Sequence, residues 1–321
     1  MDAQEQLKRW GEVSRAFSPG APIDKYKLFA GRTEQVRDVV MAVHQRGQHV
    51  ILFGERGVGK TSLANVLSEL LAQAGYRNMD SGTINCDGTD SFSSLWHKIC
   101  REMSIAHRLH KPGFTSQPAE THQSLESLLP EKVTPEDVRY ILQHLETSTI
   151  IIDELDRMKA GETTTLLADT IKSLSDHSVN TTLILVGIAD SVDDLIAEHH
   201  SIERSLVQVH MPRMSRTELF EILDKGLAEV RMTIQDDAKE RLAELSQGLP
   251  HYTHLLGLHA AQTALSENRE QITRSDVEAA IRIAVAKAQQ SIRNAYHKAT
   301  HSPRQGTLYA RVLLACCSRA L

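Results

Sequence analysis

Residues 54–61, Gly-Glu-Arg-Gly-Val-Gly-Lys-Thr, constrain the fold of this chain more than any other segment. They fit the pattern GxxxxGK[ST], and they lie between a short apolar run at 49–53 and an aliphatic stretch that continues to about residue 74. This order predicts a buried parallel strand, a glycine-rich turn and a helix. In such a turn the backbone N–H groups and the helix N-terminus face an anion. The segment therefore predicts a phosphate-binding loop.

Two side chains of this loop have specific expected roles. Lys60 is expected to bridge the β- and γ-phosphates of ATP, and the Thr61 hydroxyl is expected to ligate Mg²⁺. The loop as a whole is expected to bind the nucleotide. Its predicted ATP-binding residues are Gly54, Glu55, Arg56, Gly57, Val58, Gly59, Lys60, Thr61 and Ser62.

A second motif, Ile150-Ile151-Ile152-Asp153-Glu154, lies further along the chain. Its apolar run predicts a strand that ends in two acidic side chains, and ligands of doubly wound sheets bind at that edge. Asp153 is expected to hold Mg²⁺, mostly through water. Glu154 is expected to orient the attacking water and to act as the general base of ATP hydrolysis. An acid in this position is also common as a helix cap, but its place after the phosphate-binding loop favours the catalytic role.

The pattern of apolar segments predicts the fold class. Five strand-like runs are separated by helical segments, which indicates a five-stranded parallel αβα sheet, doubly wound. From residue 215 onward the pattern is helical only, with expected helices at about 216–230, 236–247, 251–266 and 276–299. Two of these begin with capping boxes, Ser215 with Glu218 and Ser275 with Glu278. The expected strands are 49–53, 83–87, 148–153, 182–188 and 206–210.

The expected organisation has four parts. An N-terminal helix and an adenine-side loop occupy residues 1–30, and the nucleotide-binding αβα domain occupies 31–212. Within it, residues 106–134 are polar and contain three prolines, so we expect an insertion loop there. A small all-α lid domain follows at 213–300. The remaining residues, 301–321, resemble the start of a C-terminal helix or of a truncated further domain.

Composition excludes several classes of function. The formal net charge is −5, so contact with DNA would require a local basic patch. Four cysteines form no CxxC pair and sixteen histidines form no HExxH pattern, so a structural metal is not expected. No apolar run reaches the roughly 20 residues of a membrane helix. The charged, amphipathic N-terminus is no signal peptide. We therefore expect a cytoplasmic protein without membrane contact.

The motifs together resemble those of AAA+ ATPases. The matching segments are LFAGR at 28–32, GERGVGKT at 54–61, IIIDELD at 150–156 and LILVGIAD at 183–190, followed by the helical tail. They are most similar to the initiator-like branch, which includes origin-recognition proteins and transposon target-selection ATPases. The resemblance covers about residues 20–300. It implies ATP hydrolysis to ADP and phosphate with Mg²⁺.

The resemblance implies further roles at single positions. Phe29, Gly31 and Arg32 match the segment that lines the adenine pocket, although the same residues also fit a plain helix start. Asp190 falls at the sensor-1 position, where the family usually has Asn, Ser or Thr. An ionised Asp only accepts hydrogen bonds, so a helix cap is an equal alternative for Asp190.

Arg204 lies just before the fifth expected strand, where the family carries its arginine finger. Such a residue reaches the site of a neighbouring subunit and stabilises charge on the γ-phosphate. The alternative is a surface ion pair with Glu203 or Glu198. Arg213 and Arg216 are the substitutes for this role.

The expected lid departs from the usual pattern of the family. Residues 248–254 contain no arginine at the sensor-2 position, and Gly248-Leu249-Pro250 is similar to the motif of signal-transduction (STAND) ATPases. There the proline, here Pro250, packs near the base of the nucleotide. His251 or Tyr252 would contact nucleotide or fill the core. A lid of this kind implies slow hydrolysis and a switch more than a motor.

Two functional hypotheses follow. The first is an ATP-dependent switch that forms a homo-oligomer, as a ring or a filament, and acts on DNA or on a DNA-bound protein partner. The alternative is a STAND-like signalling or defence ATPase that recruits an effector protein and does not bind DNA. A threading remodeller is disfavoured because no aromatic-glycine loop occurs near residues 85–94.

Overall fold

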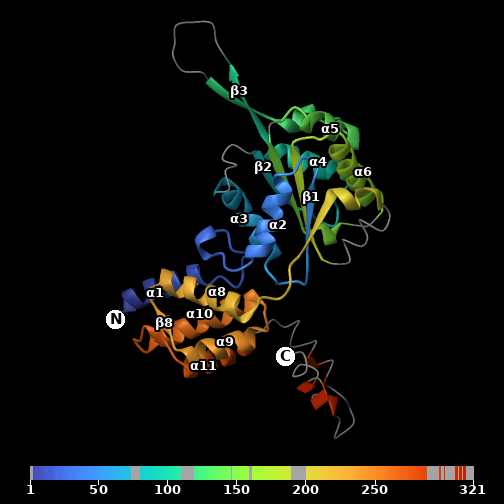
Figure 1. The fold of residues 1–321 in the computed structure, drawn as a ribbon. Coiled ribbons are helices and arrows are strands. Elements are labelled where there is room, and N and C mark those ends of the chain that lie inside the picture. The colour runs from blue at the N-terminus through green and yellow to red at the C-terminus, as the bar shows by residue number, and fades with distance from the viewer. Residues whose placement is uncertain are drawn as a thin grey trace. The chain divides into compact units, whose positions relative to one another are not determined.

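Two compact units make up the structure, a computed structural model (Figure 1). The α/β unit comprises residues 22–213, and the helical unit comprises residues 1–21 together with 214–321. The residues whose structure is described are 3–73, 80–109, 119–145, 147–158, 161–188, 200–287, 296–297, 300, 308–309, 311–312 and 314–315.

A five-stranded sheet forms the centre of the α/β unit, in the order β2-β5-β6-β1-β7. All neighbouring strands in it are parallel, as the sequence predicted. Since parallel strands are joined by crossovers, consecutive strands along the chain end at the same edge. The strands are β1 His49–Phe53, β2 Asp80–Asn85, β5 Ser148–Asp153, β6 Thr181–Gly187 and β7 Leu206–His210.

Helices cover both faces of this sheet. Side chains alternate along a strand, so Ile150 and Ile152 of β5 share a core with helices α4 Phe92–Glu102, α5 Pro135–Leu142 and α6 Glu162–Asp176. Helices α2 Thr33–Val43 and α3 Lys60–Gln73 contact the sheet strands from outside that core. The three central strands β1, β5 and β6 are buried along most of their length, which explains their continuous apolar sequences.

The segment 106–134 differs from the irregular insertion loop that we expected. Residues Ser104–Leu109 form β3 and pair antiparallel with β4, Ala119–Ser124. A short 3₁₀ helix, Leu125–Leu128, follows, with Leu125 buried in the core. None of the three prolines falls within the bounds of the two strands, so their ladder loses no N–H donor to proline. Proline content alone was therefore a poor guide to this segment.

The helical unit is not helical only, as we expected from residue 215 onward, because β8 Thr233–Ile234 pairs in parallel with β9 Gln271–Ile272. The helices of this unit include one from the N-terminal end of the sequence. The N-terminal helix α1 contacts α8 and α10. At its end, the fully buried ring of Phe17 lies against two glycines, Gly226 and Gly257. The sequence placed this segment with an adenine-side loop and gave no sign of this packing. The helices are α1 Ala3–Ala16, α8 Arg216–Glu229, α9 Asp236–Ser246, α10 Pro250–Ser266 and α11 Arg274–Ala286.

The two predicted capping boxes can be compared with the observed starts of α8 and α11. The box of Ser215 with Glu218 is confirmed at the start of α8. The box predicted at Ser275 is wrong, because Thr273 caps α11 together with Asp276. Asp276 is buried and also accepts two hydrogen bonds from Arg269, which fixes the earlier start. Both pairs have the same three-residue spacing, and the contacts of Asp276 with Arg269 distinguish them.

Three remaining expectations concern single features. Helix α11 ends at Ala286 and not near residue 299. Cys86 and Cys100 are free and buried, and burial raises the pKa of each thiol to about 12. In the part of the chain that the structure describes, no helix is long and apolar enough to cross a membrane. Cys316 and Cys317, and the short helix expected at 192–198, lie outside the described residues.

Candidate functional site

The loop after β1 has a backbone that requires glycine. Gly54 has φ 157°, and a Cβ placed there would collide with the carbonyl oxygen of Met211. Gly57 and Gly59 have φ 85° and 97°, which other residues rarely adopt. The chain then enters α3 at Lys60. The glycines of the motif are therefore explained by the turn itself.

Lys60 is held inside this loop. Its ammonium Nζ donates hydrogen bonds to the carbonyl oxygens of Gly54 and Glu55, both at 2.9 Å. Burial lowers the pKa of Lys60, while the nearby carboxylates of Asp156 and Asp153 oppose that shift. A half-buried cation, glycine-rich backbone and a helix N-terminus together form an anion-binding site.

The two acids predicted at the end of β5 have different environments. Asp153 is buried, and burial raises its pKa, although a hydrogen bond with Thr61 works in the opposite direction. Its Oδ1 accepts the backbone N–H of Glu154 at 2.7 Å. Glu154 adopts a left-handed conformation, with φ 57°, and its side chain is 44% exposed. The turn thus directs one carboxylate inward and leaves the next open to solvent.

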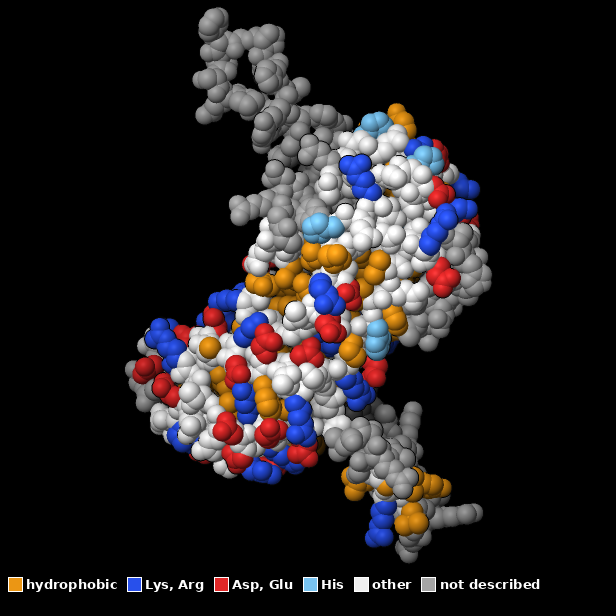
Figure 2. All heavy atoms as spheres, viewed as in Figure 1, with side chains coloured by type: hydrophobic (Ala, Val, Ile, Leu, Met, Phe, Trp, Pro, Cys, Tyr) orange, Lys and Arg blue, Asp and Glu red, His pale blue; other side chains and the backbone are white. Residues whose placement is uncertain are grey.

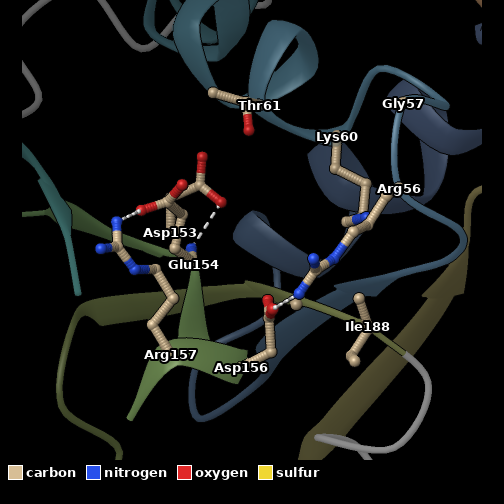
Figure 3. Close-up of a pocket in the computed structure, with 10 residues that line it drawn as sticks. Arg56, Gly57, Lys60, Thr61, Asp153, Glu154, Asp156, Arg157 and Ile188 are labelled. Carbon is tan, nitrogen blue, oxygen red and sulfur yellow. Dashed lines mark hydrogen bonds and ion pairs between the residues drawn. The ribbon is translucent and has the colours of Figure 1, made fainter. Parts of the chain in front are cut away.

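One cleft of about 400 Å³ brings the predicted residues together (Figure 3). It lies at the carboxyl ends of β1, β5 and β6, the edge where ligands bind in doubly wound sheets. Figure 3 shows Thr61 facing Asp153 and Glu154 across the cleft. The predicted residues that line it are Arg56, Gly57, Lys60, Thr61, Asp153 and Glu154.

Four further lining residues were not predicted: Asp156, Arg157, Gly187 and Ile188. Asp156 binds Arg56 at 3.2 Å, and Arg157 binds Glu154 at 2.7 Å. Asp156 follows the Asp-Glu pair at a two-residue spacing, and Gly187 ends a predicted strand, so position alone could have found both. No sequence pattern indicated that Arg157 would bind the catalytic candidate Glu154.

The donor set at this cleft fits a magnesium-bound phosphate. A hydroxyl and a carboxylate, from Thr61 and Asp153, are hard oxygen ligands of the kind that Mg²⁺ prefers. Among the described residues no cluster of three or more His, Cys, Asp or Glu could hold a metal alone. Mg²⁺ is commonly bound by one or two protein oxygens together with phosphate and water, so two protein ligands suffice.

The residues expected near the adenine lie elsewhere in the α/β unit. Phe29 is buried, and Gly31 and Arg32 both have positive φ angles, 64° and 63°. The Arg32 side chain contacts the phosphate-binding loop, where it donates to the carbonyl of Val58 at 2.7 Å. Ser62 accepts the backbone N–H of Ile23 at 3.1 Å. The adenine role of Phe29, Gly31 and Arg32 stays a prediction, as does the nucleotide contact of Ser62.

Arg204 lies where the strands of the sheet begin, whereas the cleft lies where they end. Leu206 pairs with His49 at the start of β1, whereas the phosphate-binding loop follows the end of β1. At about 3.3 Å per residue, the five residues of β1 separate these edges by ~17 Å. The Arg204 side chain is 81% exposed, and its Nη2 lies 3.7 Å from Oδ1 of Asp176, whereas the ion pair considered above was with Glu203 or Glu198. Glu198 lies outside the described residues. Arg204 therefore cannot reach the cleft of its own chain.

The alternative arginines have ion-pair partners within their own units. Arg213 binds Glu55 of the phosphate-binding loop at 2.9 Å. Arg216 binds Glu240 at 3.3 Å in the helical unit. Pro250 is the first residue of α10, and Gly248 before it has φ 75°. Asp190 lies outside the described residues.

A protein-family model described as AAA domain matches residues 43–196. The match includes the phosphate-binding loop and the Asp153–Glu154 pair. This stretch of the chain is similar to AAA domains. A search of curated protein sequences found no match. The AAA+ resemblance noted from the motifs is thus confirmed by an independent comparison for the part of the chain that carries the cleft.

Solved structures show the same fold. The ORC2 protein of Aeropyrum pernix, in ADPNP–ADP complexes, has a TM-score of 0.58 at 15% identity, over 90% of this chain and 74% of that one. A Walker-type ATPase of Pyrococcus abyssi has a TM-score of 0.58 at 16% identity, over 88% and 80%. RuvB of Thermotoga maritima, a Holliday junction branch migration motor, has a TM-score of 0.50 at 16% identity, over 81% and 72%. At such identities the likeness concerns the fold.

Proposed function

We propose that this protein is an ATPase, with slow hydrolysis coupled to assembly. The observation that carries the proposal is that Lys60, Thr61, Asp153 and Glu154 line one cleft of the AAA domain (Figure 3). A cation, a hydroxyl, a buried carboxylate and an exposed carboxylate match the phosphate-binding, metal-binding and water-orienting groups of phosphoryl transfer to water. The ORC2 structure that shares this fold contains adenine nucleotides by its name.

Each residue has a separate role in this proposal. Lys60 holds the β- and γ-phosphates, and Thr61 and Asp153 hold Mg²⁺. Bound Mg²⁺ would neutralise developing charge on the phosphate oxygens. Glu154 orients a water and accepts its proton. The exposure of Glu154 supports this role, because a base for water attack must be accessible to water.

Two substitutions test the enzyme. Lys60→Ala is expected to abolish ATP binding, measured by calorimetry. Glu154→Gln is expected to bind ATP with unchanged affinity and to lower kcat by about a hundredfold or more. Lys172→Ala, an exposed position on α6, is the control and should match the wild type in both assays. Wild-type hydrolysis by Glu154→Gln would remove Glu154 as the base.

We further propose that ATP drives assembly and that Arg204 acts on the site of a neighbouring subunit. Its high exposure and its distance from its own cleft support action in trans. Arg204→Ala is expected to bind ATP but hydrolyse it more slowly. When it is mixed with Glu154→Gln, each intact site can receive Arg204 from the other variant, so activity should be partly restored. Lack of any restoration over a range of mixing ratios would contradict a shared site.

The proposed target is DNA or a DNA-bound protein. A structure with this fold is named as a Holliday junction branch migration motor, and another is named ORC2. The test is mass photometry of the protein with ADP, ATP or a slowly hydrolysed ATP analogue, with and without duplex DNA, at two salt concentrations. Assembly that requires ATP and is promoted by DNA at low salt would support this target.

The alternative is a STAND-like ATPase that recruits an effector protein without DNA. It is favoured by Gly248-Leu249-Pro250, in which glycine with φ 75° precedes a proline that begins α10. The net charge of −5 also agrees with it. Assembly that depends on ATP but is indifferent to DNA in the same experiment would support this alternative over the first.

A further inference from the structure

Arg32 has a backbone conformation that needs an explanation. Together with Gly31 it forms two consecutive left-handed residues immediately before α2. Left-handed backbone is readily accessible to glycine but is unfavourable for arginine. A strained residue of this kind persists where the surrounding structure uses its position. The side chain of Arg32 shows what that use is.

This side chain is buried against the phosphate-binding loop. Only 2% of Arg32 is exposed, and its Nη2 donates to the carbonyl oxygen of Val58 at 2.7 Å. Val58 itself is buried, with 1% exposed. The bond thus joins the guanidinium to the middle of the loop from its buried side.

The contact at the carbonyl of Val58 also determines where the next N–H group points, because a peptide unit is planar. The described residues contain no cis peptide bond, so the carbonyl of Val58 and the N–H of Gly59 point in opposite directions. Because the carbonyl is directed to the buried guanidinium, the N–H of Gly59 is directed away from the buried side. Gly59, on the N–H side of this peptide unit, has φ 97°, and glycine restricts the torsions of such a unit less than other residues do. The bond from Arg32 holds the carbonyl side of the unit.

We propose that Arg32 is a positioning residue, which orients the Val58–Gly59 peptide so that its N–H faces the phosphates of the bound nucleotide. The guanidinium also places a permanent positive charge behind an anion-binding loop. The burial of Arg32 leaves almost no surface for contact with a base, which distinguishes this role from the adenine-pocket role that the resemblance implied. The inference rests on the proposed nucleotide binding.

The experiment separates phosphate recognition from base recognition. Arg32→Lys and Arg32→Met are titrated with MgATP and with magnesium tripolyphosphate, which has no base. We expect Arg32→Met to lose about tenfold or more in affinity for both probes, as for removal of a charge-assisted hydrogen bond. Arg32→Lys should recover part of the loss, because it keeps the charge but not the fork of donors. Measured with ATP, KM should rise in the same proportion, with kcat at saturation changed less.

Arg9→Lys is the matched control. Arg9 also donates from Nη2 to a backbone carbonyl, that of Val230 at 3.0 Å, but in the helical unit. The Arg9→Lys variant should bind MgATP and magnesium tripolyphosphate with the affinity of the wild type. Melting temperatures establish that each variant is folded.

Three outcomes would overturn the proposal. Loss of ATP affinity with unchanged tripolyphosphate affinity would assign Arg32 to the adenine pocket. Unchanged affinity for both probes would assign it no role in binding. Failure of both Arg32 variants to fold would make Arg32 a requirement of the fold. If instead the wild type binds neither probe, the proposed function itself fails, and that result is distinct from the other three.

Discussion

Nη1 of Arg157 lies 2.7 Å from Oε2 of Glu154 at the mouth of the cleft (Figure 3). The two side chains are 54% and 44% exposed, so the pair can open at little cost. The hydrogen bond of Glu154 is the largest cause that raises the pKa of Arg157. This bond occupies one lone pair of Oε2 and holds the carboxylate in one orientation. The pair therefore restrains the residue that we propose as the base.

Arg157→Ala is expected to raise kcat for ATP roughly two- to fivefold, the range of an exposed ion pair, with KM unchanged. The melting temperature should change by no more than about 2 °C. Arg101→Ala is the matched control, since Arg101 forms an Arg–Glu pair with Glu126 away from the cleft. A lower kcat in Arg157→Ala, but not in Arg101→Ala, would show that Arg157 presents Glu154 to water and does not restrain it.

Gly54→Ala is expected to disrupt the phosphate-binding loop. The added Cβ would collide with the backbone of Met211, and backbone cannot move aside as a flexible side chain can. We expect a loss of unfolding free energy on the order of 2 kcal/mol, together with weaker ATP binding. Urea unfolding and calorimetry measure the two effects. Gly20→Ala is the control, because, chain neighbours apart, no heavy atom of the described residues lies within 4 Å of its added Cβ.

Much of the α/β unit could be predicted from sequence because its determinants are local. The apolar run of β1 and the glycines after it encode strand, turn and helix within a few residues, and the observed β1 has the predicted bounds. The position of Asp153 and Glu154 could be predicted in the same way, because they lie directly at the end of the apolar run of β5. In each case the residues that form the element are also the residues that identify it.

The contacts that the sequence did not predict join residues far apart in the chain. Arg32 reaches Val58, and Phe17 reaches Gly226 and Gly257, and no periodicity or motif encodes such pairs. The surface in Figure 2 likewise mixes acidic and basic side chains in a way that the net charge does not specify. Long-range partners depend on how elements pack, and a single sequence fixes that only through the complete fold.

The effect of Gly226→Ala on the free energy of unfolding should change sign when Phe17 is replaced by alanine. A Cβ at Gly226 would lie 2.6 Å from Cζ of the buried Phe17 ring, so Gly226→Ala alone should destabilise the protein by about 1–3 kcal/mol. Phe17→Ala alone should cost about 3–5 kcal/mol through the cavity that it leaves. In the Phe17→Ala background, Gly226→Ala should instead stabilise by up to about 1 kcal/mol, because alanine favours a helix and the clash is absent. Additive effects in urea unfolding would contradict this packing.

Two buried histidines predict how stability depends on pH. Burial lowers the pKa of His49, whose Nδ1 accepts the N–H of Leu183 at 3.0 Å, to about 4. Burial also lowers the pKa of His254 to about 4. Unfolded histidine binds a proton near pH 6.5. Between pH 6.5 and 4 the unfolded chain therefore binds more protons than the folded one, so stability falls as the pH falls through this window.

Each histidine is expected to contribute on the order of 3 kcal/mol to this loss by pH 4. Comparison of His254→Leu with the wild type isolates one contribution, because carboxylates that also titrate are common to both proteins. In urea unfolding at pH 7.5, 6 and 5, the variant should lose less stability than the wild type, so its unfolding free energy relative to that of the wild type should rise as the pH falls. Parallel curves for the two proteins would show that His254 can be protonated in the folded state and that its burial carries no such cost.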